Sequence, residues 1–275
     1  MIHAKIVVDS SANMTASTAV SSVPLKIITD NKEYIDDANL NTAAMVWDLQ
    51  TYTGKSSTAC PSPQDWLEAF GNAPYVFCIA ITSNLSGCCN AANIAKADYE
   101  LAYPDRKVCV IDSLSTGGEM ELIAEKIQEL MAAELSFEEI CEKVKDYQQH
   151  TGLMFMLESM QNLANNGRVN KIVAKAAGIL GIRAVGKASN VGTLEPMDKC
   201  RGEKKALAAL ADNMVALGYD GGKMRISHCL NLSAAETLKA NILAAYPGAD
   251  IQIRPTGGLC SFYAEKGGLL IGFEK

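Results

Sequence analysis

Three apolar runs rich in β-branched residues dominate the first half of this chain, and each leads directly into a polar loop. Because their hydrophobicity is continuous rather than alternating, we expect strands covered on both faces, which is typical of a parallel sheet in an α/β domain. The loops that follow such strands lie on one rim of the sheet, where ligands bind. The runs are residues 5–8, 76–81 and 108–111, and the loops open with Asp9-Ser10-Ser11, Thr82-Ser83 and Asp112-Ser113.

The second half also alternates strands and helices, but it contains a hairpin around Asn190-Val191-Gly192. A hairpin makes neighbouring strands antiparallel, so this half is expected to form a mixed sheet. The chain is therefore predicted to form two α/β domains, residues 1–152 and 153–275, the first with a mostly parallel sheet and the second with a mixed one. A Ser136–Glu139 capping box begins the helix that precedes the boundary. Strands are expected at 153–157, 224–228, 251–253 and 269–273, and helices at 172–179, 203–217 and 234–245.

Charge and hydrophobicity exclude several classes of protein. The formal net charge of the 275 residues is −6, and no stripe of Lys and Arg with interleaved aromatics occurs, which argues against nucleic-acid binding. The apolar runs are too short to span a bilayer, and the N-terminal residues have no long apolar core or cleavage site. We therefore expect a cytoplasmic protein without a membrane span.

Cofactor and metal motifs are missing from the sequence. It contains no Gly-x-Gly-x-x-Gly, Walker A, His-Glu-x-x-His or Gly-x-Ser-x-Gly pattern, and its nine cysteines include no Cys-x-x-Cys pair. We expect no cofactor, no metal and no disulfide framework.

Two hydroxyl-rich segments, residues 58–63 and 82–87, favour an anion-binding pocket. The second lies between the strand 76–81 and a helix-forming run at 91–97, so Ser86 is predicted to cap or open that helix. Unpaired N–H groups and the helix dipole favour a carboxylate or phosphate there. An ordinary Ser N-cap accounts for the same pattern.

Other side chains leave room for an enzyme. Ser86 or Cys88 could act as the nucleophile of a hydrolase or acyltransferase with His228 as its base, and a thiol near a helix N-terminus can have a lowered pKa. Arg168 and Arg201 lie in turn-like sequence, where either could hold a phosphate through paired hydrogen bonds. A regulatory module that binds a small anion is therefore a further alternative.

Eight segments together give the chain a resemblance to the DegV family of bacterial fatty-acid-binding proteins along essentially its whole length. They are Val7 to Asn13, Val23-Pro24-Leu25, Tyr34-Ile35-Asp36, Thr58 to Pro63, Ser83 to Gly87, Asp112-Ser113, Gly167-Arg168-Val169 and Arg201-Gly202.

The resemblance implies a non-enzymatic carrier that encloses one long-chain fatty acid between two α/β domains. By motif, Thr58 and Ser86 correspond to the hydroxyls that hold the carboxylate. Some members of the family present the acyl chain to a fatty-acid kinase, and those members have a His where this chain has Tyr263. Candidate residues at the rim or facing a partner are Ser83, Gly87, Arg168, Arg201, His228 and Tyr263. Met154, Met156 and Met160 are candidates for an adaptable apolar wall.

Overall fold

The computed structural model describes residues 3–14, 20–170 and 181–275, so the helix predicted at 172–179 lies outside the described residues. Its first sheet has the strand order β2-β1-β6-β7, and every neighbouring pair is parallel. The parallel sheet predicted from the three apolar runs is thus confirmed, with one further strand, β2. The strands are β1 (Ala4–Asp9), β2 (Val20–Val23), β6 (Tyr75–Ala80) and β7 (Lys107–Asp112).

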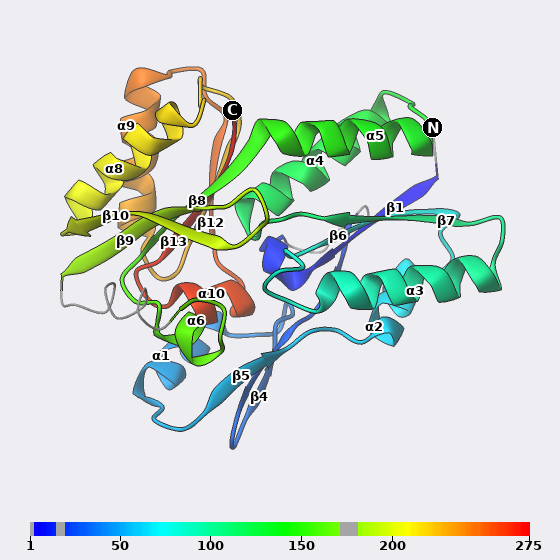
Figure 1. The fold of residues 1–275 in the computed structure, drawn as a ribbon, viewed down its shortest axis with the longest axis horizontal. Helices are drawn as coiled ribbons and strands as arrows, with labels where there is room; N and C mark the ends of the chain where they lie inside the picture. Colours follow the sequence, from blue (N-terminus) through cyan, green and yellow to red (C-terminus); the bar gives the residue numbers. More distant parts are fainter. Residues whose placement is uncertain (1–2, 15–19, 171–180) are drawn as a thin grey trace.

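Helices cover both faces of the parallel sheet (Figure 1), which explains the continuous hydrophobicity of its strands. On one face lie α2 (Pro63–Phe70) and α3 (Cys88–Ala102), and on the other lie α4 (Gly118–Ala132) and α5 (Phe137–Tyr147). The capping box predicted before α5 is confirmed, because Ser136 Oγ accepts from the Glu139 N–H and the Glu139 carboxylate accepts from the Ser136 N–H.

A three-stranded antiparallel sheet, not expected from the sequence, extends the first half. Its order is β4-β3-β5, with β3 (Lys26–Thr29), β4 (Glu33–Ile35) and β5 (Ser56–Ala59), and α1 (Thr42–Thr51) connects the last two. These strands have three or four residues each, and β5 reads Ser-Ser-Thr-Ala, so they lack the apolar pattern that marks a strand.

The second large sheet has six strands in the order β10-β9-β8-β13-β11-β12. Only β11 and β12 are parallel, and the other neighbours are antiparallel, which confirms the mixed sheet. The strands are β8 (Thr151–Leu157), β9 (Ile182–Ala188), β10 (Leu194–Arg201), β11 (Met224–His228), β12 (Ile251–Pro255) and β13 (Leu269–Glu274).

The two faces of the mixed sheet have different neighbours. The outer face packs against α8 (Glu203–Ala216) and α9 (Leu232–Ala245), and the inner face turns toward α10 (Gly258–Ala264) and α6 (Gln161–Asn165) (Figure 1). Short 3-10 turns follow β1 at Ser10–Ala12 and precede β8 at Gln148–His150. The domain boundary between residues 152 and 153 stays a prediction.

Helix α4 packs directly on the backbone of the mixed sheet as well as on the parallel one. A Cβ atom on Gly118 would lie 2.2 Å from the Arg225 carbonyl oxygen, and one on Gly272 would lie 2.1 Å from the Glu119 nitrogen. Only glycine permits so close an approach of helix and strand backbones. The first turn of α4 therefore fixes the separation of the two sheets.

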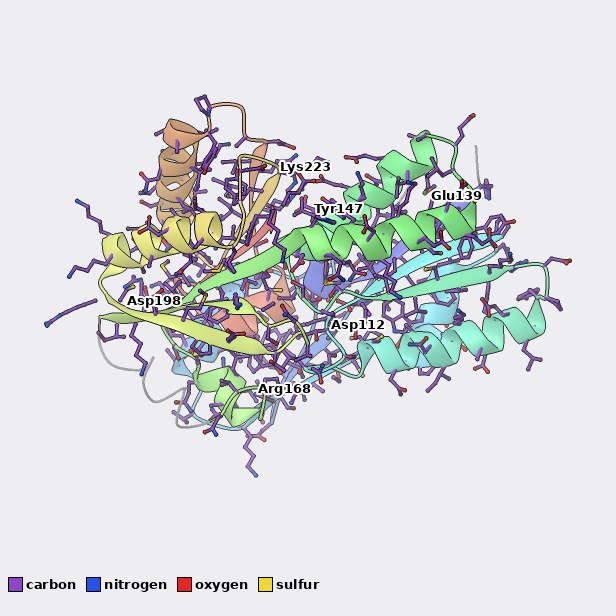
Figure 2. The ribbon with its side chains drawn as sticks, turned by 45° about the horizontal axis from the view of Figure 1, so that its top comes forward. Asp112, Glu139, Tyr147, Arg168, Asp198 and Lys223 are labelled. Atoms are coloured by element: carbon purple, nitrogen blue, oxygen red, sulfur yellow. The ribbon has the colours of Figure 1, made fainter. Side chains whose placement is uncertain are left out.

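Ion pairs extend this contact along α4. The Arg225 side chain is 2% exposed and pairs with Glu125 at 2.7 Å, and Arg254 pairs with the buried Glu121 at 2.7 Å. Lys223 reaches the same helix and is labelled beside Tyr147 in Figure 2. Removing one partner of a buried pair leaves an uncompensated charge, so these contacts resist separation of the sheets.

We predict that Gly272→Ala lowers the free energy of unfolding by about 2–3 kcal/mol, because its new methyl group would overlap the backbone of α4. Gly248→Ala is the matched control, since a Cβ atom there meets nothing within 4 Å. Urea unfolding of both variants measures the difference, and equal stabilities would show that α4 does not need this close approach.

Candidate functional site

A cavity of about 320 Å³ lies between the rim of the parallel sheet and the inner face of the mixed sheet. Its size is at the lower end of the range for small-molecule sites. Most of its wall is apolar and comes from Leu25, Ile81, Leu85, Leu114, Leu153, Phe155, Leu157, Leu163, Leu194, Leu259 and Leu270.

The three polar loops of the parallel sheet meet beside this cavity, as predicted. The Ile81 N–H donates to the Asp9 carboxylate at 2.7 Å, which joins the loops after β1 and β6. The Ser83 N–H donates to Asp112 at 3.1 Å, which joins the loops after β6 and β7. The buried Asp9 and the half-buried Asp112 thus tie the three rim loops together.

The cavity is elongated along the rim. Leu25 follows β2 at one edge of the sheet and Leu114 follows β7 at the other, so three strand spacings, about 14 Å, separate their positions. The opposite wall is β8, where Leu153, Phe155 and Leu157 line the cavity over a similar length of about 13 Å. The two walls form a long apolar slot.

Polar groups gather at the end of the slot near β5. Thr58 on β5 and Tyr263 on α10 share a hydrogen bond of 2.8 Å between their hydroxyl oxygens. Burial raises the pKa of Tyr263, so its phenol keeps its proton and can donate. Ser86 and Gly87 line the cavity with them, and we call this group the hydroxyl end.

Arg168 also lines the cavity, and its positive charge acts on the Tyr263 phenol. Its Nε donates to the Leu85 carbonyl at 3.1 Å, in the segment that leads to Ser86. Figure 2 shows Arg168 beside α6, away from the ion pairs of α4. The arginine therefore holds the Ser86 loop and adds a cation near the hydroxyl end.

The prediction that Ser86 caps a helix needs correction. Helix α3 begins at Cys88 and its N-cap is Gly87, so Ser86 lies one residue earlier. Its Oγ accepts from the Cys88 N–H at 3.3 Å and donates to Cys88 Sγ at 3.2 Å. The hydroxyl still adjoins the first turn of α3, where free N–H groups favour an anion.

Three further candidates, Ser83, Arg201 and His228, are not among the described residues that line the cavity. The Ser83 N–H is used to join the rim loops, and Arg201 ends β10 with its side chain exposed. His228 Nδ1 accepts from the Asn231 N–H at 3.3 Å.

Among the described residues, neither Ser86 nor Cys88 is hydrogen-bonded to His228, the base proposed for a hydrolase. Ser86 is hydrogen-bonded to Cys88, whereas His228 is engaged with Asn231. Burial raises the pKa of the Cys88 thiol and raises that of Cys89 to about 11, so neither thiol is activated. The expected lowering of a thiol pKa by the helix N-terminus is therefore wrong here, because desolvation outweighs the helix dipole.

The methionines proposed for the wall lie elsewhere. Successive side chains of a strand point to opposite faces, so the Leu153, Phe155 and Leu157 series faces the slot while Met154 and Met156 pack under α8 and α9. Met160 is buried in a third cluster and, like the other two methionines, is outside the lining described.

Cys60, Ser115 and Thr116 line the cavity and belong to segments that the sequence assigned to the site, the hydroxyl-rich segment 58–63 and the polar loop after β7. Lys187 and Thr193 also line it and were not expected. Lys187 and Thr193 flank the hairpin and carry no local signal.

Within residues 3–14, 20–170 and 181–275, no group of three or more His, Cys, Asp or Glu side chains is placed to hold a metal ion. No helix within the same residues combines the length and hydropathy that crossing a membrane requires.

Comparison with known proteins shows the family to which the chain belongs. Residues 3–275 match the family model described as "Uncharacterised protein, DegV family". The chain belongs to the DegV family. A DegV domain-containing protein of Streptococcus pneumoniae is 45% identical over 258 residues, which cover 94% of this chain and 92% of the relative.

Two solved structures share the fold along the whole chain. A DegV family protein from Eubacterium eligens, loaded with heptadecanoic acid, has a TM-score of 0.97 and 43% identity and covers 99% of each chain. The Streptococcus pneumoniae Fatty Acid Kinase (Fak) B3 protein, loaded with linoleic acid, also has a TM-score of 0.97 and 43% identity, with 100% of this chain and 99% of that one covered. The predicted family and fold class are therefore confirmed.

We predict that Asp9 makes the stability of the rim depend on pH. Complete burial raises the pKa of Asp9 from 3.8 to about 6, although Ser11 and Ile81 donate to it. Between these values the folded protein keeps a proton that the unfolded chain has released, so stability falls as the pH rises from about 4 to about 6. The contribution is on the order of 2–3 kcal/mol.

Asp9→Asn tests this assignment through the pH slope rather than the absolute stability. The amide loses one acceptor oxygen, so the variant should be less stable at pH 4, and because it does not ionise, this part of the slope should vanish. Urea unfolding at several values between pH 4 and 7 compares the two proteins, and an unchanged slope would assign the titration to another buried carboxyl group.

Proposed function

We propose that this chain binds one long-chain fatty acid, with the acyl chain in the slot and the carboxylate at the hydroxyl end. The observation that carries the proposal is the division of one cavity into a cluster of hydroxyl donors and an apolar slot about 14 Å long. An amphiphile with a small anionic head and a straight apolar tail matches that division.

The head group has a defined set of donors. The hydroxyls of Thr58, Ser86 and Tyr263 can each turn a proton toward a carboxylate, and hydrogen bonds to a charged group contribute about 1.5–3 kcal/mol each. Arg168 adds a favourable charge, and the first turn of α3 adds the positive end of a helix dipole. These interactions orient the acid in the slot.

The tail supplies most of the affinity. Each buried methylene group contributes about 0.8 kcal/mol before the entropic cost of binding. Most of the residues that line the slot are leucines from both sheets, joined by Ile81 and Phe155, so the tail meets a mainly apolar wall.

Relatives at 43% identity that hold heptadecanoic and linoleic acid support this ligand class. The name of the Streptococcus pneumoniae protein associates it with a fatty acid kinase. We propose that this chain likewise acts as a carrier and presents the bound carboxylate to such a kinase rather than catalysing a reaction itself. In that role Tyr263 offers the carboxylate a neutral phenol.

We predict that the Thr58→Ala/Ser86→Ala double variant loses its fatty acid. Removing two hydrogen bonds to a carboxylate should weaken binding by roughly 10²- to 10⁴-fold. Both proteins are purified without detergent and compared by native mass spectrometry, in which the wild type should carry one fatty acid per chain.

Ser83→Ala is the control, because Ser83 belongs to the same loop but does not line the cavity. It should retain the acid like the wild type. A double variant that is folded by circular dichroism and still retains its acid fully would contradict the proposed head-group site.

A further inference from the structure

The cavity has a second end, opposite the hydroxyl end, and its construction differs. We define this far end by Leu114, Leu153 and Gly192, which come from the parallel sheet, the mixed sheet and the β9–β10 hairpin. Leu114 follows β7, which is one edge strand of the parallel sheet. Thr58 lies on β5, in the small sheet that the chain enters directly after the other edge strand, β2. A tail that enters from the hydroxyl end therefore finishes here.

Leu114 has an unusual backbone conformation for a leucine. Its φ of 52° lies in the left-handed region, which non-glycine residues rarely adopt. The loop holds it there, because the Leu114 N–H donates to Asp112 at 3.1 Å and the Ser115 N–H donates to Ser113 Oγ at 3.1 Å. Strain that the surrounding structure maintains is a recognised mark of functional positions.

The tip of the β9–β10 hairpin closes the slot against Leu114. A Cβ atom on Gly192 would lie 2.9 Å from Leu114 Cα and 2.1 Å from Thr82 Oγ1, so the backbone of the hairpin tip touches the backbone of the loop after β7. Asn84 Nδ2 also donates to the Val191 carbonyl at 2.6 Å, which ties the tip to the loop after β6. The hairpin tip thus meets Leu114 through its backbone and meets the loop after β6 through the side chains of Thr82 and Asn84.

The tip itself is internally braced. The Gly192 N–H and the Ser189 N–H both make backbone hydrogen bonds of 2.8 Å within it, and the hydroxyls of Ser189 and Thr193 are 2.8 Å apart. Hydrogen bonds hold the backbone of both the Leu114 loop and the hairpin tip, so a longer tail cannot push them outward without breaking several of these bonds.

We propose that Leu114 is the stop that limits the length of the bound acyl chain, so that this protein selects fatty acids by where their methyl end meets this residue. This inference rests on the proposed fatty-acid binding and adds to it the residue that determines chain-length specificity. Leu114 is suited to the role because it lines the cavity at the far end and its backbone is held by hydrogen bonds of its own loop.

The test is Leu114→Gly. Glycine adopts a φ of 52° without strain, so the fold should survive, and the lost side chain frees roughly the volume of four carbon atoms at the far end. An apolar ligand group can fill such a space. The preferred chain should lengthen by about two to four carbons, and the binding ratio of the longer to the original acid should rise by about tenfold or more.

The measurement is a competition experiment by native mass spectrometry with an equimolar ladder of saturated fatty acids of about 14 to 22 carbons, chosen as chains that a small-molecule pocket can largely bury. Val191→Ala is the matched control, because Val191 is 58% exposed, does not line the cavity and keeps its carbonyl bond to Asn84. Its length preference should equal that of the wild type.

Leu114→Phe provides the opposite test, since a larger side chain at the stop should shift the preference toward shorter acids. The inference is overturned if Leu114→Gly keeps the wild-type preference while the wild type binds the ladder, or, should the glycine variant fail to fold, if Leu114→Phe keeps it. A wild-type protein that binds none of the acids would instead refute the proposed function, so the two failures are distinguishable.

Discussion

The contact between α4 and the mixed sheet determines the geometry of everything that surrounds the cavity. At Gly118 and Gly272 the backbones of helix and strand approach more closely than any residue with a Cβ atom would allow. The buried Arg225–Glu125 pair then extends the contact along the helix. Because α4 also covers the parallel sheet, it ties together the two walls of the slot.

Within that frame the cavity separates orientation from affinity. Hydroxyls of Thr58, Ser86 and Tyr263 are concentrated at one end, where they can share a carboxylate, and the remainder of the wall offers mainly apolar contact. Burial keeps the thiol of Cys88 protonated, and Nδ1 of His228 accepts a hydrogen bond from the nearby Asn231 N–H rather than from Ser86 or Cys88.

Local pattern predicted much of the fold but not all of it. The continuous apolar runs indicated the parallel sheet because a strand that is buried on both faces needs an apolar side chain at nearly every position. The β4-β3-β5 sheet was not predicted, because its strands have only three or four residues and contain no long apolar run. Met154 and Met156 were predicted to line the cavity from composition alone, and this prediction was wrong. Alternate side chains of β8 face opposite sides of the sheet, so Leu153 and Phe155 line the slot instead.

The sequence by itself determined the two α/β halves, the polar rim and the family, because these depend on periodicity and on short motifs whose residues are neighbours in the chain. Only the tertiary structure decided which hydroxyls meet and where the slot ends. Thr58 and Tyr263 are 205 residues apart yet share a hydrogen bond, and Gly192 closes on Leu114 from a different sheet. Contacts of that kind follow from how the two sheets pack on α4, and a linear pattern carries no record of the resulting distances.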